Sequence, residues 1–219
     1  AAPMTAKLPP NASVARPAGH KKLYAPAADR NKDALCDLLL AHAPRQGTAL
    51  EIASGTGQHV IAFAHALPGL SWCPTDPDPA RRASIDAYVA ETGMTNIAPA
   101  QALDATVEGW HETMPGQDLI FLANLLHLVS APAVECLITQ AASALVPGGT
   151  LILYGPFIRD GQLTSEGDVK FDADLRAADP DIGYKDTADV TRWLSDATLS
   201  PIDLVPMPAN NLAFISRKP

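Results

Sequence analysis

The sequence predicts an α/β fold in which a seven-stranded, mostly parallel sheet carries helices on both faces and closes with an antiparallel hairpin. From Asp29 onward, helix-like and strand-like apolar patterns alternate, as they do in parallel sheets covered on both sides. Short apolar runs end in acidic or amide residues, and a turn with two glycines follows the first run, within Glu51–His59. With 219 residues, 47% of them apolar and 18% charged, the chain can bury one sizeable core.

The first half of the chain alternates helices and strands. Leucines at helical spacing predict a helix over 31–42. Asp78 and Pro79 supply an N-cap and a proline at the first helical position, which predicts a helix start there. The elements expected between and after these two helices are strands over 48–53, 70–75 and, more weakly, 96–103, and a helix over 58–67.

The second half supplies the rest of the sheet. The short apolar run Asp118–Ala123 predicts a buried strand. Pro132 starts a helix with a continuous apolar stripe, and the Pro-Gly-Gly turn at 147–149 ends it. The remaining elements expected are a strand over 150–154, an irregular cap over 159–185, a helix over 187–197, and hairpin strands over 200–206 and 211–217.

Charge separates the N-terminal residues from the rest. Residues 1–28 contribute +4 to the formal net charge of −8, which leaves −12 on residues 29–219. Such an acidic body repels phosphate backbones, so nucleic acid is not an expected partner. We predict a disordered basic leader over 1–23, with 1–3 derived from a vector, and a single domain over 24–219.

Composition also restricts the compartment and the kind of site. No apolar run approaches the length of about 18 residues that a membrane span needs, and the start does not have the order of a secretory signal. Three separated cysteines without CxxC spacing favour a reducing, cytoplasmic compartment. The six histidines lack metal-ligand spacing, so no metal is expected. The sequence does not indicate an oligomeric state.

The turn after the first strand predicts a ligand. Gly55 and Gly57 have no Cβ, so the backbone can approach a bound molecule closely. A dinucleotide fingerprint needs a third glycine where this chain has Val60, and no Gly-Lys-Ser/Thr of a phosphate-binding loop follows. A nicotinamide-dependent oxidoreductase is therefore disfavoured, although two glycines alone also fit an ordinary tight turn.

Polar residues end the strands that follow. Asp76 ends the second predicted strand, Asp104 the third and Asn124 the fourth. Because the carboxyl ends of parallel strands line one crevice, we expect these side chains to converge with the glycine turn. Taken singly, Asp76 and Asp104 also fit turn or cap positions.

Together these features resemble the class I S-adenosylmethionine (SAM)-dependent methyltransferases, which have a Rossmann-like fold. The resemblance is carried by Glu51-Ile-Ala-Ser-Gly-Thr-Gly57, by Asp76 and by the turn and strand Leu145–Tyr154. The chain departs from the pattern at Ala53, where many members have glycine.

Other segments are similar to the methyltransferase-like protein 26 family, over roughly residues 24–219. They are Ala25–Lys32, Ser54–His59, Gly155–Phe157 and Met207–Asn211. This similarity implies the fold and SAM as cofactor, and brings no established methyl acceptor with it.

The resemblance also implies roles for the crevice residues. Glu51 is expected at the methionine end of SAM, Asp76 at the ribose and Asp104 at the adenine. The positions expected to bind the cofactor are Glu51, Ser54, Gly55, Gly57, Asp76, Asp104 and Asn124.

Four residues are candidates for the chemistry. His127, three positions past Asn124, is the candidate general base, and its alternative is a packing or capping role. Arg30 and Asn31 precede the first helix and are expected to fold over the site, although each also fits an N-cap or a surface ion pair. The planar fork of Arg30 suits a carboxylate of SAM or of an acidic acceptor. Tyr154 either simply ends its strand or turns its hydroxyl toward the acceptor.

The sequence therefore predicts a SAM-dependent methyltransferase that moves a methyl group to a thiol, amine or hydroxyl of a small molecule by in-line displacement. Since the cofactor carries the reactive group, such a protein aligns the reactants and excludes water. The main alternative is a SAM-binding sensor or regulatory protein without transferase activity, with the basic leader as its contact arm.

Overall fold

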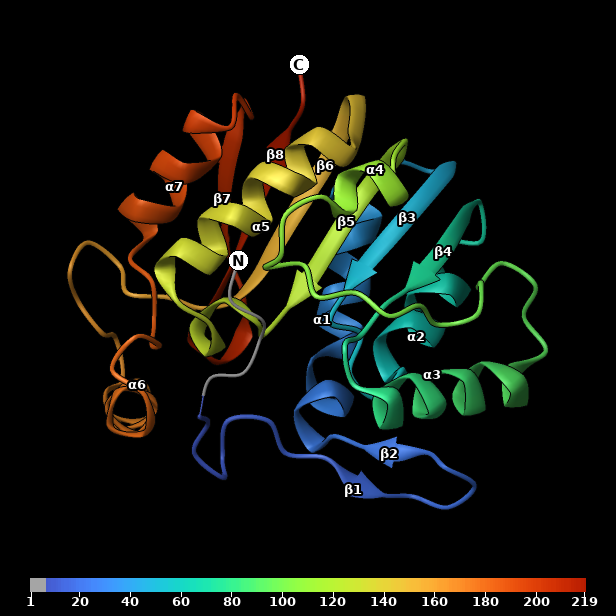
Figure 1. Cartoon of the computed structure of the whole chain (residues 1–219), viewed down its shortest axis with the longest axis horizontal. Coiled ribbons are helices and arrows are strands. Elements are labelled where there is room, and N and C mark those ends of the chain that lie inside the picture. The colour runs from blue at the N-terminus through green and yellow to red at the C-terminus, as the bar shows by residue number, and fades with distance from the viewer. Residues whose placement is uncertain (1–6) are drawn as a thin grey trace.

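A mixed sheet forms the centre of the molecule (Figure 1). The computed structural model describes residues 7–219, and within them the main sheet has six strands in the order β4-β3-β5-β6-β8-β7. The first four strands are parallel, and β8 runs antiparallel to both β6 and β7. The predicted α/β fold with a C-terminal hairpin is confirmed. The strands are β3 (Gly47–Ile52), β4 (Leu70–Pro74), β5 (Gln117–Ala123), β6 (Leu145–Pro156), β7 (Ile202–Pro206) and β8 (Asn211–Arg217).

The predicted count of seven strands is wrong, because the segment 96–103 forms no strand. In the described part of the chain it pairs with β4 only through isolated bridges at Ile97 and Gln101. Pro99 lies between these bridges and Pro74 lies opposite in β4, and neither has a backbone N–H to continue a ladder. The segment still runs beside β4 and covers that edge of the sheet.

Helices cover both faces of this sheet (Figure 1). None of the helices within residues 7–219 is both long and apolar enough to cross a membrane. One face carries α1 (Pro26–His42), α2 (Gln58–Ala66) and α3 (Pro79–Thr92), and the other carries α4 (Trp110–Thr113), α5 (Ala131–Ala144) and α7 (Thr187–Asp196).

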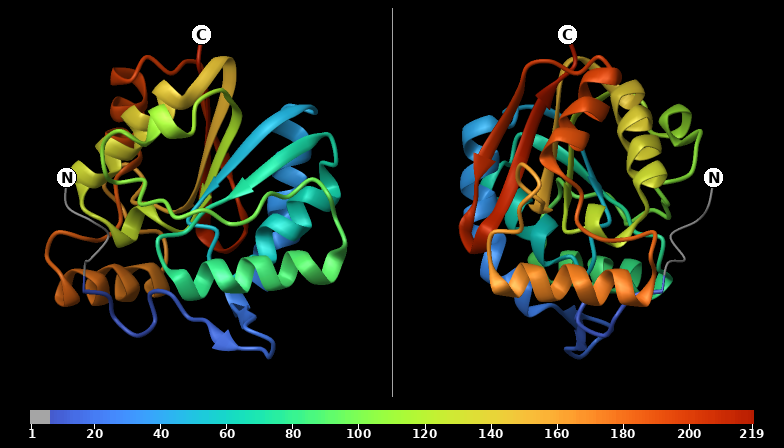
Figure 2. Two further views of the ribbon diagram at one scale, coloured as in Figure 1. Left: turned by 45° about the vertical axis from the view of Figure 1, so that its right-hand side comes forward. Right: turned by 90° about the vertical axis from the view of Figure 1, so that its left-hand side faces the viewer.

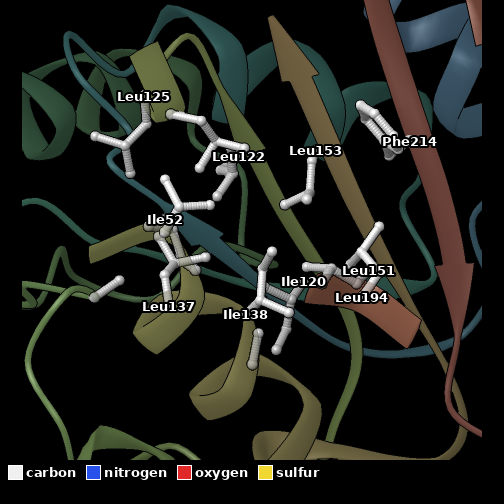
Figure 3. Packing of buried hydrophobic residues seen from close by; sticks show 14 of the residues in the cluster. Ile52, Ile120, Leu122, Leu125, Leu137, Ile138, Leu151, Leu153, Leu194 and Phe214 are labelled. Atoms are coloured by element: carbon white, nitrogen blue, oxygen red, sulfur yellow. The ribbon is translucent and has the colours of Figure 1, made fainter. Parts of the chain in front are cut away.

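The two layers of the core follow from the alternation of side chains along β5. Ile120 and Leu122 point into the cluster beneath α5 and α7, part of which Figure 3 shows. Leu119 and Phe121 point to the other face and pack with α1 and α2. A strand buried on both faces is apolar throughout, which is why its sequence pattern was easy to identify.

The expected irregular cap over 159–185 contains a helix, α6 (Glu166–Ala178). Ser165 begins it: its Oγ accepts a hydrogen bond from the Asp168 N–H at 3.1 Å and donates one to Asp168 Oδ2 at 2.8 Å. This capping-box signal is present in the sequence. The apolar stripe is weak, because α6 lies across the carboxyl ends of the strands instead of on a face of the sheet (Figure 2).

Residues 7–24, called here the N-terminal arm, have a defined path on the same side of the molecule. The arm contains a short hairpin of β1 (Arg16–Pro17) and β2 (Leu23–Tyr24), which lies beside α3 (Figure 1). The disordered leader expected over residues 1–23 stays a prediction. The division of the chain at residue 24 stays a prediction, and the vector origin of residues 1–3 lies outside the described residues.

Hydrogen bonds to α3 hold the arm in this path. The Leu23 N–H donates to Ser84 Oγ at 2.8 Å, and the Tyr88 hydroxyl donates to the Leu23 carbonyl at 2.8 Å. Ser84 is fully buried and also donates to the Thr56 carbonyl at 2.6 Å. One hydroxyl therefore joins the arm, α3 and the loop after β3, a contact between distant segments that no local pattern reveals.

Replacement of Ser84 by alanine tests this junction. In Ser84→Ala two backbone groups lose their partner, and we expect the free energy of unfolding to fall by about 1–3 kcal/mol. Urea denaturation measures the change. Thr139→Ala, which removes an exposed hydroxyl bonded to the Glu135 carbonyl within α5, is the control and should change stability by less than about 0.5 kcal/mol. Equal losses of unfolding free energy in Ser84→Ala and Thr139→Ala would contradict the role of Ser84 as the junction between the arm, α3 and the loop after β3.

Candidate functional site

A cavity of about 1070 Å³ lies at the carboxyl ends of the parallel strands. Its walls come from the loops after β3, β4 and β5, from the end of β6, from α1, α6 and the turn between β7 and β8, and from the N-terminal arm. This volume suits a cofactor together with a small second ligand. The predicted site residues that line it are Arg30, Asn31, Ser54, Gly55, Asp76, Asn124, His127 and Tyr154.

The loop after β3 is fixed against the end of β4. The Ser54 N–H donates to the Thr75 carbonyl at 2.7 Å, and the Thr75 N–H donates to Ser54 Oγ at 3.0 Å. Gly57 does not line the cavity; a Cβ there would lie 2.8 Å from the Ile85 Cα, at a backbone φ of +100°. The absence of a side chain at Gly57 thus serves the packing of the loop on α3, whereas Gly55 faces the cavity.

Asp76 presents a carboxylate to this loop. Its Oδ2 accepts from the Gly55 N–H and its Oδ1 from the Asp78 N–H, each at 3.0 Å. Burial raises the pKa of the Asp76 carboxyl, while these two backbone donors and the nearby Arg81 act in the opposite direction. Each oxygen keeps a lone pair, so the group can accept further hydrogen bonds from hydroxyls of a ligand.

Glu51 is buried and is not part of the cavity wall. Its Oε1 has no hydrogen-bond partner among the described residues. Burial raises the pKa of the carboxyl from 4.5 to about 8; the Ser54 hydroxyl opposes this rise and the charge of Asp76 adds to it. The carboxyl group is therefore protonated at neutral pH.

Asp104 also lies outside the cavity wall. Its Oδ1 accepts from the Thr106 N–H at 3.0 Å and from the Thr106 hydroxyl at 2.6 Å. The structure thus gives Asp104 a turn geometry, and the expected adenine contact stays a prediction.

His127 faces the cavity from the 3-10 turn η1 (Leu126–Leu128). Its ring makes edge contacts with Phe171 of α6 and with Tyr184, at centroid distances of 5.6 and 6.0 Å. Burial lowers the pKa of His127 to about 3, and the charge of Lys185 acts in the same direction. The imidazole is therefore neutral at physiological pH and has an apolar aromatic surrounding.

Arg30 contributes a cation to the wall. It lies on α1 and is exposed, and within residues 7–219 its side chain forms neither a hydrogen bond nor an ion pair. Arg81, which the sequence did not single out, is a second cation at the cavity; it lies 3.9 Å from an Asp78 oxygen and donates to Ser13 of the arm at 3.1 Å.

Several wall residues lie outside the sequence-based assignment for two reasons. Some come from segments without a clear sequence pattern, namely the arm, α6 and the hairpin turn, and others lie on α2 or at the start of α3, where only the fold shows that their side chains reach the cavity. The capping box at Ser165 could have identified α6, but nothing local places that helix over the site. The missed residues with polar or aromatic side chains are Asn11, Ser13, His59, Asp78, Arg81, Asp168, Phe171, Tyr184 and Asn211.

A model of the family described as "Protein of unknown function (DUF938)" matches residues 22–218. The chain belongs to this DUF938 family. Among curated proteins, the tetracenomycin polyketide synthesis 8-O-methyltransferase TcmO of Streptomyces glaucescens is 24% identical over 108 residues, which are 49% of this chain and 32% of that protein.

Solved structures share the fold of this DUF938 chain. The apo SAM-dependent methyltransferase SibL matches with a TM-score of 0.72 and 20% identity, over 88% of this chain and 56% of that one. Human N-acetylserotonin methyltransferase in complex with SAM matches with a TM-score of 0.70 and 15% identity, over 86% of this chain and 51% of that one. An O-methyltransferase family 2 protein from Planctomyces limnophilus in complex with apigenin matches with a TM-score of 0.67 and 22% identity, over 88% of this chain and 61% of that one. The chain spans little more than half the length of these proteins, and its fold is that of SAM-dependent methyltransferases.

The pKa of Glu51 predicts a specific pH dependence of stability. The native state holds this proton up to about pH 8, whereas the unfolded chain loses it near pH 4.5, so the contribution of Glu51 to stability is complete below pH 4.5 and is lost as the pH rises to 8. In Glu51→Gln this loss disappears, and the fall in unfolding free energy between pH 5 and 8 should be smaller than in the wild type by about 1 kcal/mol per pH unit. Chemical denaturation across this range measures it. Glu112→Gln, at an exposed position on α4, should keep the wild-type slope, and a Glu51→Gln slope equal to that of the wild type would refute the prediction.

Proposed function

We propose that this DUF938 protein is a SAM-dependent methyltransferase that acts on the hydroxyl group of a small molecule. One observation carries the proposal: a single cavity joins a carboxylate at the glycine loop, Asp76, to a neutral imidazole, His127. The two groups suit the two reactants of a methyl transfer, and the cavity is large enough for both.

The residues at the ends of β3 and β4 fit SAM. Asp76 has the free lone pairs that two ribose hydroxyls require, and Gly55 leaves room for close approach. The Arg30 side chain, which has no hydrogen bond or ion pair within residues 7–219, suits a carboxylate, either that of the methionine part of SAM or that of an acidic acceptor. SAM itself supplies a methyl group on a sulfonium, which is already activated for displacement.

The wall on the other side of β5 fits the apolar part of an acceptor. Leu128, Val129 and Phe171 provide apolar surface around His127. The neutral imidazole has a lone pair for the proton that a hydroxyl releases during methylation; because burial lowers the pKa of His127 to about 3, this role requires that the bound reactants raise that pKa. The names of the similar proteins support oxygen as the acceptor atom, since one is an 8-O-methyltransferase and another binds apigenin.

We also place the protein close to the methyltransferase-like protein 26 family and in the cytoplasm. The four segments that carry that resemblance, Ala25–Lys32, Ser54–His59, Gly155–Phe157 and Met207–Asn211, all contribute to the cavity wall. The three cysteines are free thiols, which suits a reducing compartment.

Binding of S-adenosylhomocysteine tests the cofactor assignment. At 100 times its Kd this ligand should stabilise the wild type by about 2.7 kcal/mol in a thermal-shift experiment, and NAD should not. Asp76→Asn should weaken binding by about tenfold or more, because the hydrogen bonds to a charged acceptor are lost. Asp203→Asn, an exposed change on β7, should bind as the wild type does. Stabilisation by NAD alone would rule the proposal out.

A screen with labelled SAM against phenols, alcohols, thiols and amines tests transfer. With an active hydroxyl acceptor, His127→Ala should lower kcat by about 100-fold or more and leave S-adenosylhomocysteine binding unchanged. His111→Ala, on α4 outside the cavity, is the control. An unchanged kcat in His127→Ala would remove the role of general base. Cofactor binding without turnover of any acceptor would favour the SAM-binding sensor.

A further inference from the structure

Four polar side chains from four separate elements meet in the wall of the cavity. Asn31 comes from α1, His59 from α2, Tyr154 from the end of β6 and Asn211 from the start of β8, and all four line the cavity. His59 Nε2 lies 2.6 Å from Asn31 Oδ1, and the Asn211 amide donates to the Tyr154 hydroxyl at 2.9 Å.

The donors and acceptors of this network can be assigned. Burial lowers the pKa of His59 to about 4, so its ring is neutral. Its Nε2–H must donate to Asn31 Oδ1, since the carbonyl oxygen cannot donate. The amide nitrogen of Asn31 is then left as a donor, and the nearby Asn31 acts to lower the pKa of the Tyr154 phenol, against the effect of burial.

The phenol oxygen of Tyr154 accepts an N–H group from Asn211 and lies near the amide of Asn31. Its own O–H hydrogen has no acceptor among the described residues. Tyr154 is only 2% exposed, and an unpaired donor at such a site is costly. The network therefore leaves Tyr154 as a hydrogen-bond donor for a molecule in the cavity.

The strand order places this donor away from the proposed cofactor end. Asp76 follows β4 and Gly55 follows β3, whereas Tyr154 lies near the carboxyl end of β6, on the far side of β5. With about 4.8 Å between neighbouring strands, Tyr154 lies roughly 10 Å from the β3 end along the sheet. Arg30, which precedes Asn31 on α1, also lines the cavity, and its side chain has no hydrogen bond or ion pair within residues 7–219.

We propose that Tyr154, with Arg30 of the same cavity wall, binds a carboxylate of the methyl acceptor, and that Asn31, His59 and Asn211 are positioning residues that make Tyr154 a donor. The acceptor would then be a small hydroxy acid, with its hydroxyl at His127 and its carboxylate at Tyr154. This inference rests on the proposed function and adds the substrate class.

The test compares two probes of the same shape on the protein bound to S-adenosylhomocysteine: 4-hydroxybenzoate and 4-hydroxybenzyl alcohol. Isothermal titration should show that the wild type binds the carboxylate at least about tenfold more tightly. Tyr154→Phe should lose this preference. Tyr88→Phe, which removes a phenol hydroxyl outside the cavity, should keep it. An absent preference in the wild type, or a preserved one in Tyr154→Phe, overturns the inference.

A second comparison separates the carboxylate of the acceptor from that of the cofactor. Tyr154→Phe should bind S-adenosylhomocysteine and 5′-methylthioadenosine, which has no carboxylate, as the wild type does. If Tyr154→Phe weakened the binding of S-adenosylhomocysteine and left that of 5′-methylthioadenosine unchanged, Tyr154 would lie at the cofactor carboxylate and the inference would be overturned. If the wild type fails to bind S-adenosylhomocysteine, the proposed function itself fails, so the two failures can be told apart.

The positioning residues have a readout of their own. The ¹³Cζ signal of labelled Tyr154 reports the hydrogen bonds of the phenol, and it should move when 4-hydroxybenzoate is added to the wild type. Asn211→Ala should shift this signal in the free protein and reduce the carboxylate preference, and His59→Gln, which keeps an N–H donor, should retain more of the preference than His59→Leu. An unshifted signal with an intact preference in Asn211→Ala would show that the network does not set the role of Tyr154.

Discussion

The hydrogen bonds between the ends of β3 and β4 are the constraint on which the site depends. Ser54 and Thr75 exchange two of them, and the Gly55 N–H donates to Asp76. These contacts hold the glycine loop in one conformation beside a carboxylate that belongs to the next strand. Because Gly57 has no side chain, the same loop packs directly on α3, and Ser84 ties it to the N-terminal arm. The loop, the sheet edge and part of the cavity roof are thus one hydrogen-bonded unit.

Burial, more than ion pairing, sets the electrostatics of the cavity. Loss of hydration lowers the pKa of His59 and of His127, and raises that of Glu51, so all three are neutral at pH 7. The charged groups of the cavity wall include Arg30 and Asp76, whereas these three buried groups carry no charge. A site of this kind suits a reaction in which water is excluded and a proton moves between uncharged partners.

The cavity wall also shows where sequence reasoning succeeds and where it fails. Asp76 and Asn124 were identified because each directly follows an apolar strand, and parallel strands end at one edge. Asp104 was assigned by the same rule and lies outside the wall, because Pro99 breaks the strand that was expected to carry it there. Phe171 was missed because α6 buries too few residues to show a helical period.

The sequence by itself determined the layered α/β fold, the glycine loop and the residues at the ends of the strands. These depend on hydrophobic periodicity, on caps and on glycine, all of which act over a few neighbouring residues. Only the tertiary structure decided the roof of arm and α6, the neutral state of the two histidines, and the meeting of Asn31, His59, Tyr154 and Asn211. Those properties depend on burial and on contacts between segments far apart in the chain, and a local pattern carries no information about either.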